Sequence, residues 1–316
     1  MNSTTATYKR LLVPGLFFLI LILLATFPVY GSSYNVVLLA AILMYVVLTV
    51  SWTMFSGPTG YISLAPAAFF GVGIYTAAVL GKMLPLLAVV VTGGLISFIL
   101  ALIVGTITLR LRGIYFAIFT FGLVVLIKEL LLFYEIVVTG TRGRFIALVD
   151  NTTIYYVTFG IFVALMLTAY FIRRSKHGLA LQSIGENEEA AAHIGVNVTL
   201  LKVLIFAISA IFMGATGAIM ATRWTYVDPY VAFNPLFSFL PVLMAIFGGL
   251  GQLYGPVIGA AIFAYLEELL LTKFPYYYML AFGIILVVVI LYLPGGLVGL
   301  IQRWRKGGLA KQSANT

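Results

Sequence analysis

The chain has 316 residues, of which 63% are hydrophobic and 9% are charged, and its mean hydropathy is +1.14. In soluble domains roughly a quarter of the residues are charged, so this composition excludes a globular protein whose whole surface faces water. Repeated apolar stretches of about 20 residues suit helices that cross a bilayer, whereas a barrel would need alternating segments of about ten residues, which the sequence lacks. The composition predicts an all-α, polytopic helical membrane protein.

The formal net charge of +9 does not indicate nucleic acid, because basic residues of membrane proteins mostly mark the loops that stay in the cytoplasm. The chain has no cysteine, which excludes a disulfide framework. The first apolar run, residues 11–29, is long for a signal peptide and is followed by a poor cleavage site. We therefore expect it to be retained as a first membrane span.

About ten spans are expected, with eight to ten as the range. Their ranges are 11–30, 36–56, 62–80, 84–108, 114–134, 154–172, 201–222, 236–250, 256–272 and 278–297. The eighth and ninth spans, separated by Gly248–Gln252, are alternatively one broken or re-entrant element. A cytoplasmic N-terminus places twelve basic residues inside and six outside, in agreement with the positive-inside rule. We expect both termini in the cytoplasm, one transmembrane domain over residues 1–310 and a short polar tail over residues 311–316.

One polar segment, residues 173–200 with its core at Arg173–Asn197, interrupts the membrane pattern and falls on the cytoplasmic side. The core holds six charged residues and two histidines. After a break at Gly185, Asn187 suits an N-cap, two glutamates suit the first turn of a helix, and Gly195 suits a left-handed end. Such a two-turn helix is too short to be stable alone in water. It is either a docking helix held by a partner or an ordinary solvated loop. The docking candidates are Glu188, Glu189, Ala190, Ala191, Ala192, His193 and Gly195.

A second segment, residues 60–78, gathers small residues around Pro66. Proline interrupts a helix, and small residues let helices approach closely. The segment is either a discontinuous helix along a substrate route, as transporters often use, or a site of tight helix packing. The candidates for the route are Ser63, Pro66, Phe69, Phe70, Gly71 and Gly73.

Charges inside the expected spans are scarce. Lys128–Glu129 and Glu267–Glu268 fall near the expected outer ends of their spans, where side chains can reach the interface. Two outer loops, residues 135–153 and 223–235, carry the aromatic residues Trp224, Tyr226 and Tyr230, which suit either an interfacial belt or contact with a soluble partner.

The sequence contains no enzyme motif. Its two histidines, His177 and His193, both lie in the polar segment without a spacing suited to zinc, and neither a G-x-x-x-x-G-K-[ST] loop nor a G-x-S-x-G elbow is present. We expect no catalytic residue, no metal and no cofactor. If the protein is an active transporter driven by ATP, the ATPase must therefore be another chain.

Several motifs together resemble permeases of branched-chain amino acid ATP-binding-cassette importers, of the LivM type. The resemblance covers about residues 35–300 and includes E-A-A-x-x-x-G within the polar segment. The motifs span residues 60–78, 109–120, 177–197, 206–221, 248–260 and 293–300. The chain departs from the family at Ala65-Pro66, where Gly-His is usual, and at Thr139–Phe145, where two arginines enter a usually glycine-rich loop.

The resemblance implies a prokaryotic plasma-membrane importer for branched-chain or other hydrophobic amino acids. Its partners would be a second permease of the H type, two cytoplasmic ATPase subunits that bind the ATP, and a soluble substrate-binding protein. Residues 173–200 would be the coupling loop. The same machine for urea, short amides or other amino acids is an alternative, and an ion-coupled secondary transporter is another.

Overall fold

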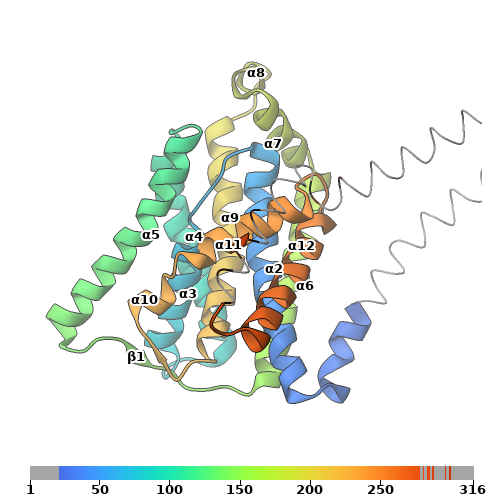
Figure 1. Cartoon of the computed structure of the whole chain (residues 1–316). Helices are drawn as coiled ribbons and strands as arrows, with labels where there is room; N and C mark the ends of the chain where they lie inside the picture. Colours follow the sequence, from blue (N-terminus) through green and yellow to red (C-terminus); the bar gives the residue numbers. More distant parts are fainter. Residues whose placement is uncertain are drawn as a thin grey trace, which may run out of the picture.

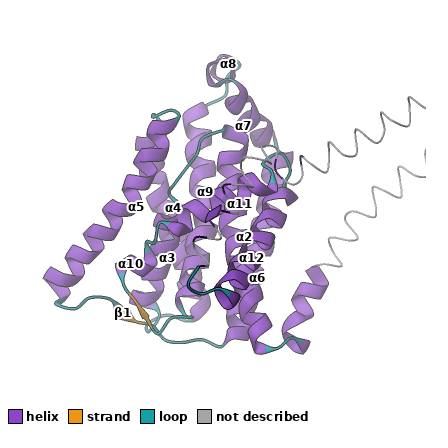
Figure 2. Cartoon of the chain, in the orientation of Figure 1, coloured by secondary structure: helices purple, strands orange, loops and turns teal. Residues whose placement is uncertain are grey.

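The computed structural model describes residues 21–277 and the isolated positions 280, 283, 284, 287, 296 and 299. It is a bundle of helices that run roughly along one direction (Figures 1 and 2). In chain order the helices are Leu21–Tyr30, α2 (Ser33–Thr59), α3 (Pro66–Leu80), α4 (Leu86–Thr108), α5 (Ile114–Tyr134) with the π-helical turn η1 (Glu135–Thr139), α6 (Asn151–Arg174), α7 (Lys176–Glu186), α8 (Glu188–His193), α9 (Val198–Ala221), α10 (Pro229–Ala232), α11 (Leu236–Gly248) and α12 (Tyr254–Lys273). Two short strands, β1 (Arg144–Phe145) and β2 (Tyr226–Val227), pair antiparallel.

The helices begin and end where local chemistry dictates. Ser32 and Asp150 cap α2 and α6 by accepting hydrogen bonds from the backbone of the first turn. α2 ends at Gly60, whose φ of +71° is favourable for glycine. α3 begins with Pro66 at its first position, where the missing N–H has no intrahelical partner to lose.

The centre of the bundle is α9, which packs closely against α3 and α4 (Figure 1). Glycines make this approach possible: a Cβ on Gly73 would collide with the carbonyl oxygen of Gly214, and one on Gly217 would collide with that of Phe70. In a bilayer the hydrophobic effect does not drive helices together, so such close backbone contact supplies much of the packing. Gly73, one of the small residues that follow Pro66, therefore contributes to this packing.

The helical membrane class is confirmed, and most expected spans are present. Among the described residues, seven helices are long and apolar enough to cross a membrane, and Leu21–Tyr30 and α3 are shorter apolar helices. With 15 residues α3 is about 22 Å long, less than the roughly 30 Å of hydrocarbon. The tenth expected span, 278–297, and the first half of the first lie largely outside the described residues, as do residues 311–316.

One detail of the expected spans needs correction: Pro66 begins α3 instead of interrupting a helix, so residues 62–65 are non-helical chain. The eighth and ninth spans are separate helices as expected, and the alternative of one broken element is excluded, because α11 and α12 fold back on each other with Gly248 packed against Gly255.

The two ends of the bundle differ. α7 and α8 project from one end, and the β1–β2 pair and α10 lie toward the opposite end (Figure 1). Within the described residues the α8 end carries Arg110, Arg112, Arg173, Arg174, Lys176 and Lys202, against Lys82, Arg142, Arg144, Arg223 and Lys273 at the other. Most of the excess of basic residues that was used to orient the chain thus comes from the terminal residues, which lie outside the described part. The placement of both termini in the cytoplasm therefore stays a prediction.

Candidate functional site

The polar segment folds into two helices, α7 and α8, joined at Asn187. Ser175 begins α7 by accepting hydrogen bonds from the backbone N–H groups of His177 and Gly178. The break expected at Gly185 is wrong: this glycine lies inside α7, because its missing side chain lets the helix pack on the carbonyl of Pro58.

The short helix expected after Asn187 is present with the expected caps. Asn187 Oδ1 accepts from the N–H groups of Glu189 and Ala190, each at 3.0 Å. Gly195 has a φ of +89°, and the next N–H, of Val196, returns to the carbonyl of Ala191 at 3.1 Å. The sequence prediction of this two-turn element is confirmed, and its ends are fixed by local hydrogen bonds.

The docking candidates divide between two faces of α8. Ala191 is 1% exposed and faces the body of the chain. The other face is open to solvent and carries Glu189, Ala190, Ala192, His193 and Gly195. Ile194, which the sequence interpretation passed over, is 75% exposed at the tip. This face offers small residues, one acid and one apolar side chain to a partner.

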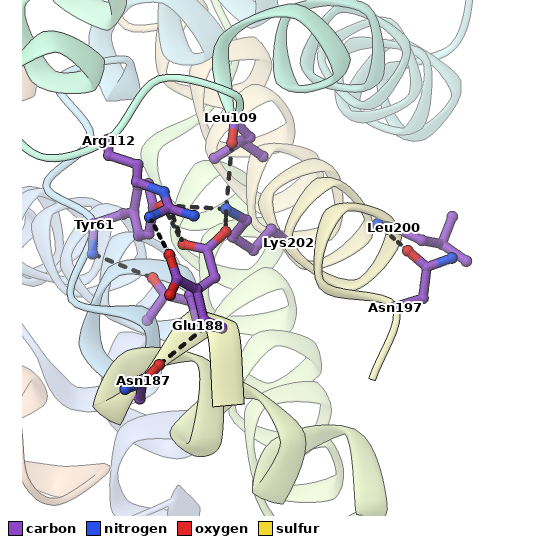
Figure 3. Close-up of polar contacts among 10 residues, drawn as sticks. Tyr61, Leu109, Arg112, Asn187, Glu188, Asn197, Leu200 and Lys202 are labelled. Carbon is purple, nitrogen blue, oxygen red and sulfur yellow. Dashed lines mark hydrogen bonds and ion pairs between the residues drawn. The ribbon is translucent and has the colours of Figure 1, made fainter. Parts of the chain in front are cut away.

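Glu188 anchors α8 to the bundle (Figure 3). Its Oε1 lies 2.7 Å from Nζ of Lys202, and its Oε2 accepts from the hydroxyl of Tyr61 at 2.6 Å. The Lys202 ammonium also donates to Tyr61 Oη at 3.1 Å and to the carbonyl of Leu109 at 3.2 Å. All three ammonium protons thus have an acceptor although the lysine is only 2% exposed. We call Glu188, Lys202 and Tyr61 the anchor.

Hydrogen bonds favour the ionised form of Glu188. Burial alone would raise the pKa of Glu188, but the hydrogen bonds from Lys202 and Tyr61 outweigh it and hold this pKa below its usual range. Arg112 adds a weaker attraction at 3.9 Å from Glu188 and lies 3.5 Å from Glu189 on the exposed face. Arg112 and Glu189 are mostly exposed, so their ion pair stabilises little.

The anchor joins α8 to the non-helical segment that precedes α3, as well as to α9. Beyond Tyr61, the backbone of this segment is held by side chains of three helices. Trp52 of α2 donates to the Ser63 carbonyl at 2.7 Å, and Thr120 of α5 accepts from the Leu64 N–H at 2.9 Å. Ser238 of α11 donates to the Leu64 carbonyl at 2.8 Å. Hydrogen bonds therefore connect α8, through the anchor and this segment, to four membrane helices: α2, α5, α9 and α11.

The candidates for the substrate route lie inside the subunit. All six are buried: Ser63, Pro66, Phe69, Phe70, Gly71 and Gly73. Phe69 packs edge-on against Phe206 with centroids 5.4 Å apart, and Phe70 packs on Phe237 at 4.6 Å. Their contacts are those of helix packing, and a role along the route stays a prediction.

A cavity of about 330 Å³ opens beside the docking segment, between α2, α6, α7 and residues 250–253. Arg173 bridges its edge by donating to the carbonyl of Gly251 at 2.5 Å. None of the six route candidates lines it.

The two outer loops form one unit. β1 and β2 join them, Arg142 Nη2 lies 3.1 Å from Asp228 Oδ2, and Arg144 Nε lies 3.8 Å from the buried carboxylate of Glu135. The arginines that depart from the family pattern are thus paired within the chain. No local sequence signal indicates these pairings. Arg142 and Asp228 are 86 residues apart, and Arg144 and Glu135 lie on either side of a turn.

With this geometry in view, comparison with known proteins identifies the chain's relatives. The family described as "Branched-chain amino acid transport system / permease component" matches residues 34–290. The chain belongs to this family. No solved structure matches it.

The individual relatives support the M-type resemblance. The chain is 26% identical to the high-affinity branched-chain amino acid transport system permease protein LivM of Salmonella typhimurium, over 92% of this chain and 77% of the relative. It is 27% identical to LivM of Escherichia coli, over 98% and 80%. LivH of Salmonella typhimurium is 26% identical over only 51% of this chain and 52% of its own length. The chain is thus a multi-pass transport permease of the bacterial inner membrane that resembles LivM along nearly its whole length.

Proposed function

We propose that this permease is the M-type subunit of an importer that carries branched-chain amino acids into the cytoplasm. The observation that carries the proposal is the family match over residues 34–290, together with a capped, exposed docking helix anchored to the bundle. The LivM relatives bear branched-chain amino acid transport in their names.

The importer needs further chains. The LivM and LivH relatives support a second permease subunit, which we assign to the H type. Two cytoplasmic ATPases would bind and hydrolyse the ATP and would dock on the exposed face of α8. A soluble binding protein would deliver the substrate to the opposite end, where the outer loops form one unit. The permease itself would hold no metal or cofactor and would perform no catalysis.

This arrangement requires the α8 end, and with it both termini, to lie in the cytoplasm. A movement of α8 caused by the ATPase would be transmitted through Glu188 to Lys202 near the start of α9 and to Tyr61, which precedes α3. Because the anchor ties three segments together, the docking helix and the bundle would move as one body.

The test is reconstitution of the complete importer, with its partner permease, ATPases and binding protein, in lipid vesicles. We expect uptake of leucine, isoleucine or valine that requires ATP and the binding protein. A panel with urea, short amides and other amino acids identifies the cargo if these three are not carried. Uptake that follows an ion gradient and ignores ATP contradicts the proposal.

A further inference from the structure

Helix α5 and the turn η1 that continues it carry a charged pair, Lys128 and Glu129, inside one helical path. The sequence placed Lys128 and Glu129 near the end of a span at residue 134. In the structure the helical path continues through η1, so the candidate span is Ile114–Thr139. Glu129 is ten residues from Thr139, the last five of them in the π-helical turn η1. The pair therefore lies further from the end of the helical path than the sequence placed it, and the expectation that both side chains reach the interface stays a prediction.

This glutamate also faces outward. Of the long described helices α5 is the least covered by the rest of the chain. In its most apolar stretch 17% of the residues are buried, against 39–61% in the other long helices. Its outward face is otherwise apolar, with Leu126, Leu130 and Phe133 each more than half exposed. The Glu129 side chain is 54% exposed on this face.

The pair is connected to the outer end of the bundle. Glu129 Oε1 lies 3.1 Å from Lys128 Nζ, which lies 4.9 Å from the centre of the Tyr230 ring. The same ring lies 4.8 Å from the guanidinium carbon of Arg142, which pairs with Asp228. A continuous line of charged and aromatic groups therefore leads from the outer loops to the middle part of α5.

Contact between lipid and the face of α5 that carries Glu129 is energetically unfavourable. A charged side chain near the middle of a bilayer costs about 2.5–3.5 kcal/mol on insertion scales, and such residues normally face water or a partner. The ion pair with Lys128 lowers this cost, but half of the carboxylate side chain remains uncovered. The exposure and the charges of this face suit contact with water or a partner subunit better than contact with lipid.

We propose that Lys128 and Glu129 are positioning residues for a zwitterionic amino acid on its way through the transporter. The carboxylate of Glu129 accepts hydrogen bonds from the substrate ammonium, and the ammonium of Lys128 donates to the substrate carboxylate. Leu126, Leu130 and Phe133 offer apolar contact to the substrate side chain. The proposal rests on the proposed function, since it takes its substrate class from there.

The absence of cysteine from this chain permits a direct test. Glu129→Cys is compared with Leu95→Cys, which is 51% exposed on α4 and lies nine residues from the outer end of that helix. Both are assembled with cysteine-free partner subunits in vesicles and treated from outside with a charged, membrane-impermeant thiol reagent. We expect Glu129→Cys to react at least about tenfold faster than Leu95→Cys, and turnover with leucine, binding protein and ATP to slow its labelling. If Glu129→Cys does not assemble, Leu126→Cys on the same face replaces it.

Equal, slow labelling of both cysteines overturns the proposal, because the face then borders lipid or a dry subunit contact. Fast labelling that leucine does not slow overturns the binding role. The comparison of labelling rates needs no transport activity, and slowing by leucine is judged only with an importer whose unsubstituted chain shows ATP-dependent uptake, so these outcomes are distinct from failure of the proposed function. As a second readout, Glu129→Gln should lower maximal uptake about tenfold, the loss expected for one charge-assisted hydrogen bond, with leucine affinity of the binding protein unchanged. Unchanged maximal uptake contradicts the proposal.

Discussion

Lys202 of α9 and Glu188 of α8 lie 2.7 Å apart, Nζ to Oε1, and so join the exposed helix α8 to the central membrane helix. The lysine is 2% exposed and the glutamate side chain 21% exposed. Buried ion pairs are weak evidence for stability, because desolvation offsets much of the attraction, but breaking one leaves an uncompensated charge. We interpret the pair as a rigid connection between α8 and the bundle.

Replacing Lys202 with methionine should destabilise the folded chain. The cost for one partner of a fully buried pair is 3–5 kcal/mol, and partial exposure of Glu188 reduces it to about 2 kcal/mol. Thermal unfolding in detergent should show a lower Tm for Lys202→Met and a partial recovery in Glu188→Gln/Lys202→Met, in which no unpaired charge remains. Equal Tm values for the single and double variants would show that the two residues are not coupled.

The anchor should be insensitive to pH near neutrality. The folded-state pKa of Glu188 is held below that of the unfolded chain, about 4.3. The stabilisation is therefore complete above the unfolded pKa and is lost as the pH falls through the folded value. The Tm difference between the unsubstituted chain and Glu188→Gln should be constant from about pH 6 to pH 8 and shrink below about pH 4. A difference that changes between pH 6 and pH 8 contradicts this assignment.

Glu189→Lys tests docking on the exposed face of α8. The side chain is 76% exposed and, within the described residues, its one ion pair is with Arg112, whose side chain is 63% exposed, so folding should be unaffected. A reversed charge at the contact should lower ATPase binding to the permease in pull-down by roughly tenfold, in the range measured for interface charges. Lys82→Glu, an exposed residue at the opposite end, makes a charge change of equal size and should leave ATPase binding unchanged. Equal binding by both variants would remove α8 from the contact.

Gly73 distinguishes packing from a role in the route. A Cβ there collides with the carbonyl of Gly214, whereas one at Gly122 on α5 meets nothing. Gly73→Ala should separate α3 from α9 and cost about 1–3 kcal/mol, as overpacking does, while Gly122→Ala should be neutral or stabilising. Thermal unfolding of the two variants side by side checks this. A Gly73→Ala chain as stable as the parent would leave room at that position for substrate.

Local rules explain what could be predicted from the sequence. Asn187 and Gly195 act within a few residues of themselves, so the caps of α8 could be predicted without a structure. The spans were recognisable because lipid requires long apolar helices. Gly185 was misjudged because its neighbour is Pro58, more than 100 residues away, and only tertiary packing explains a glycine inside α7.

Contacts between distant segments were beyond the sequence pattern. Lys202 reads as one more cytoplasmic basic residue, since nothing near it indicates that Glu188, Tyr61 and Leu109 converge on its ammonium. The extension of α5 through η1 was missed because Glu135 ends the apolar run. In the fold that carboxylate is buried by Tyr75 and Arg144 and the helical path continues.

The ratio of leucine imported to ATP hydrolysed, measured in the same vesicles for the unsubstituted importer and for Lys202→Met, tests most directly whether the anchor transmits motion. With equal amounts of ATPase bound, we predict that Lys202→Met hydrolyses ATP at a comparable rate but imports at least about tenfold less leucine per ATP, because the loss of one charged contact of about 1.5 kcal/mol corresponds to that factor. An unchanged ratio with the ATPases still bound would contradict the account, because α8 would then drive the bundle without Lys202.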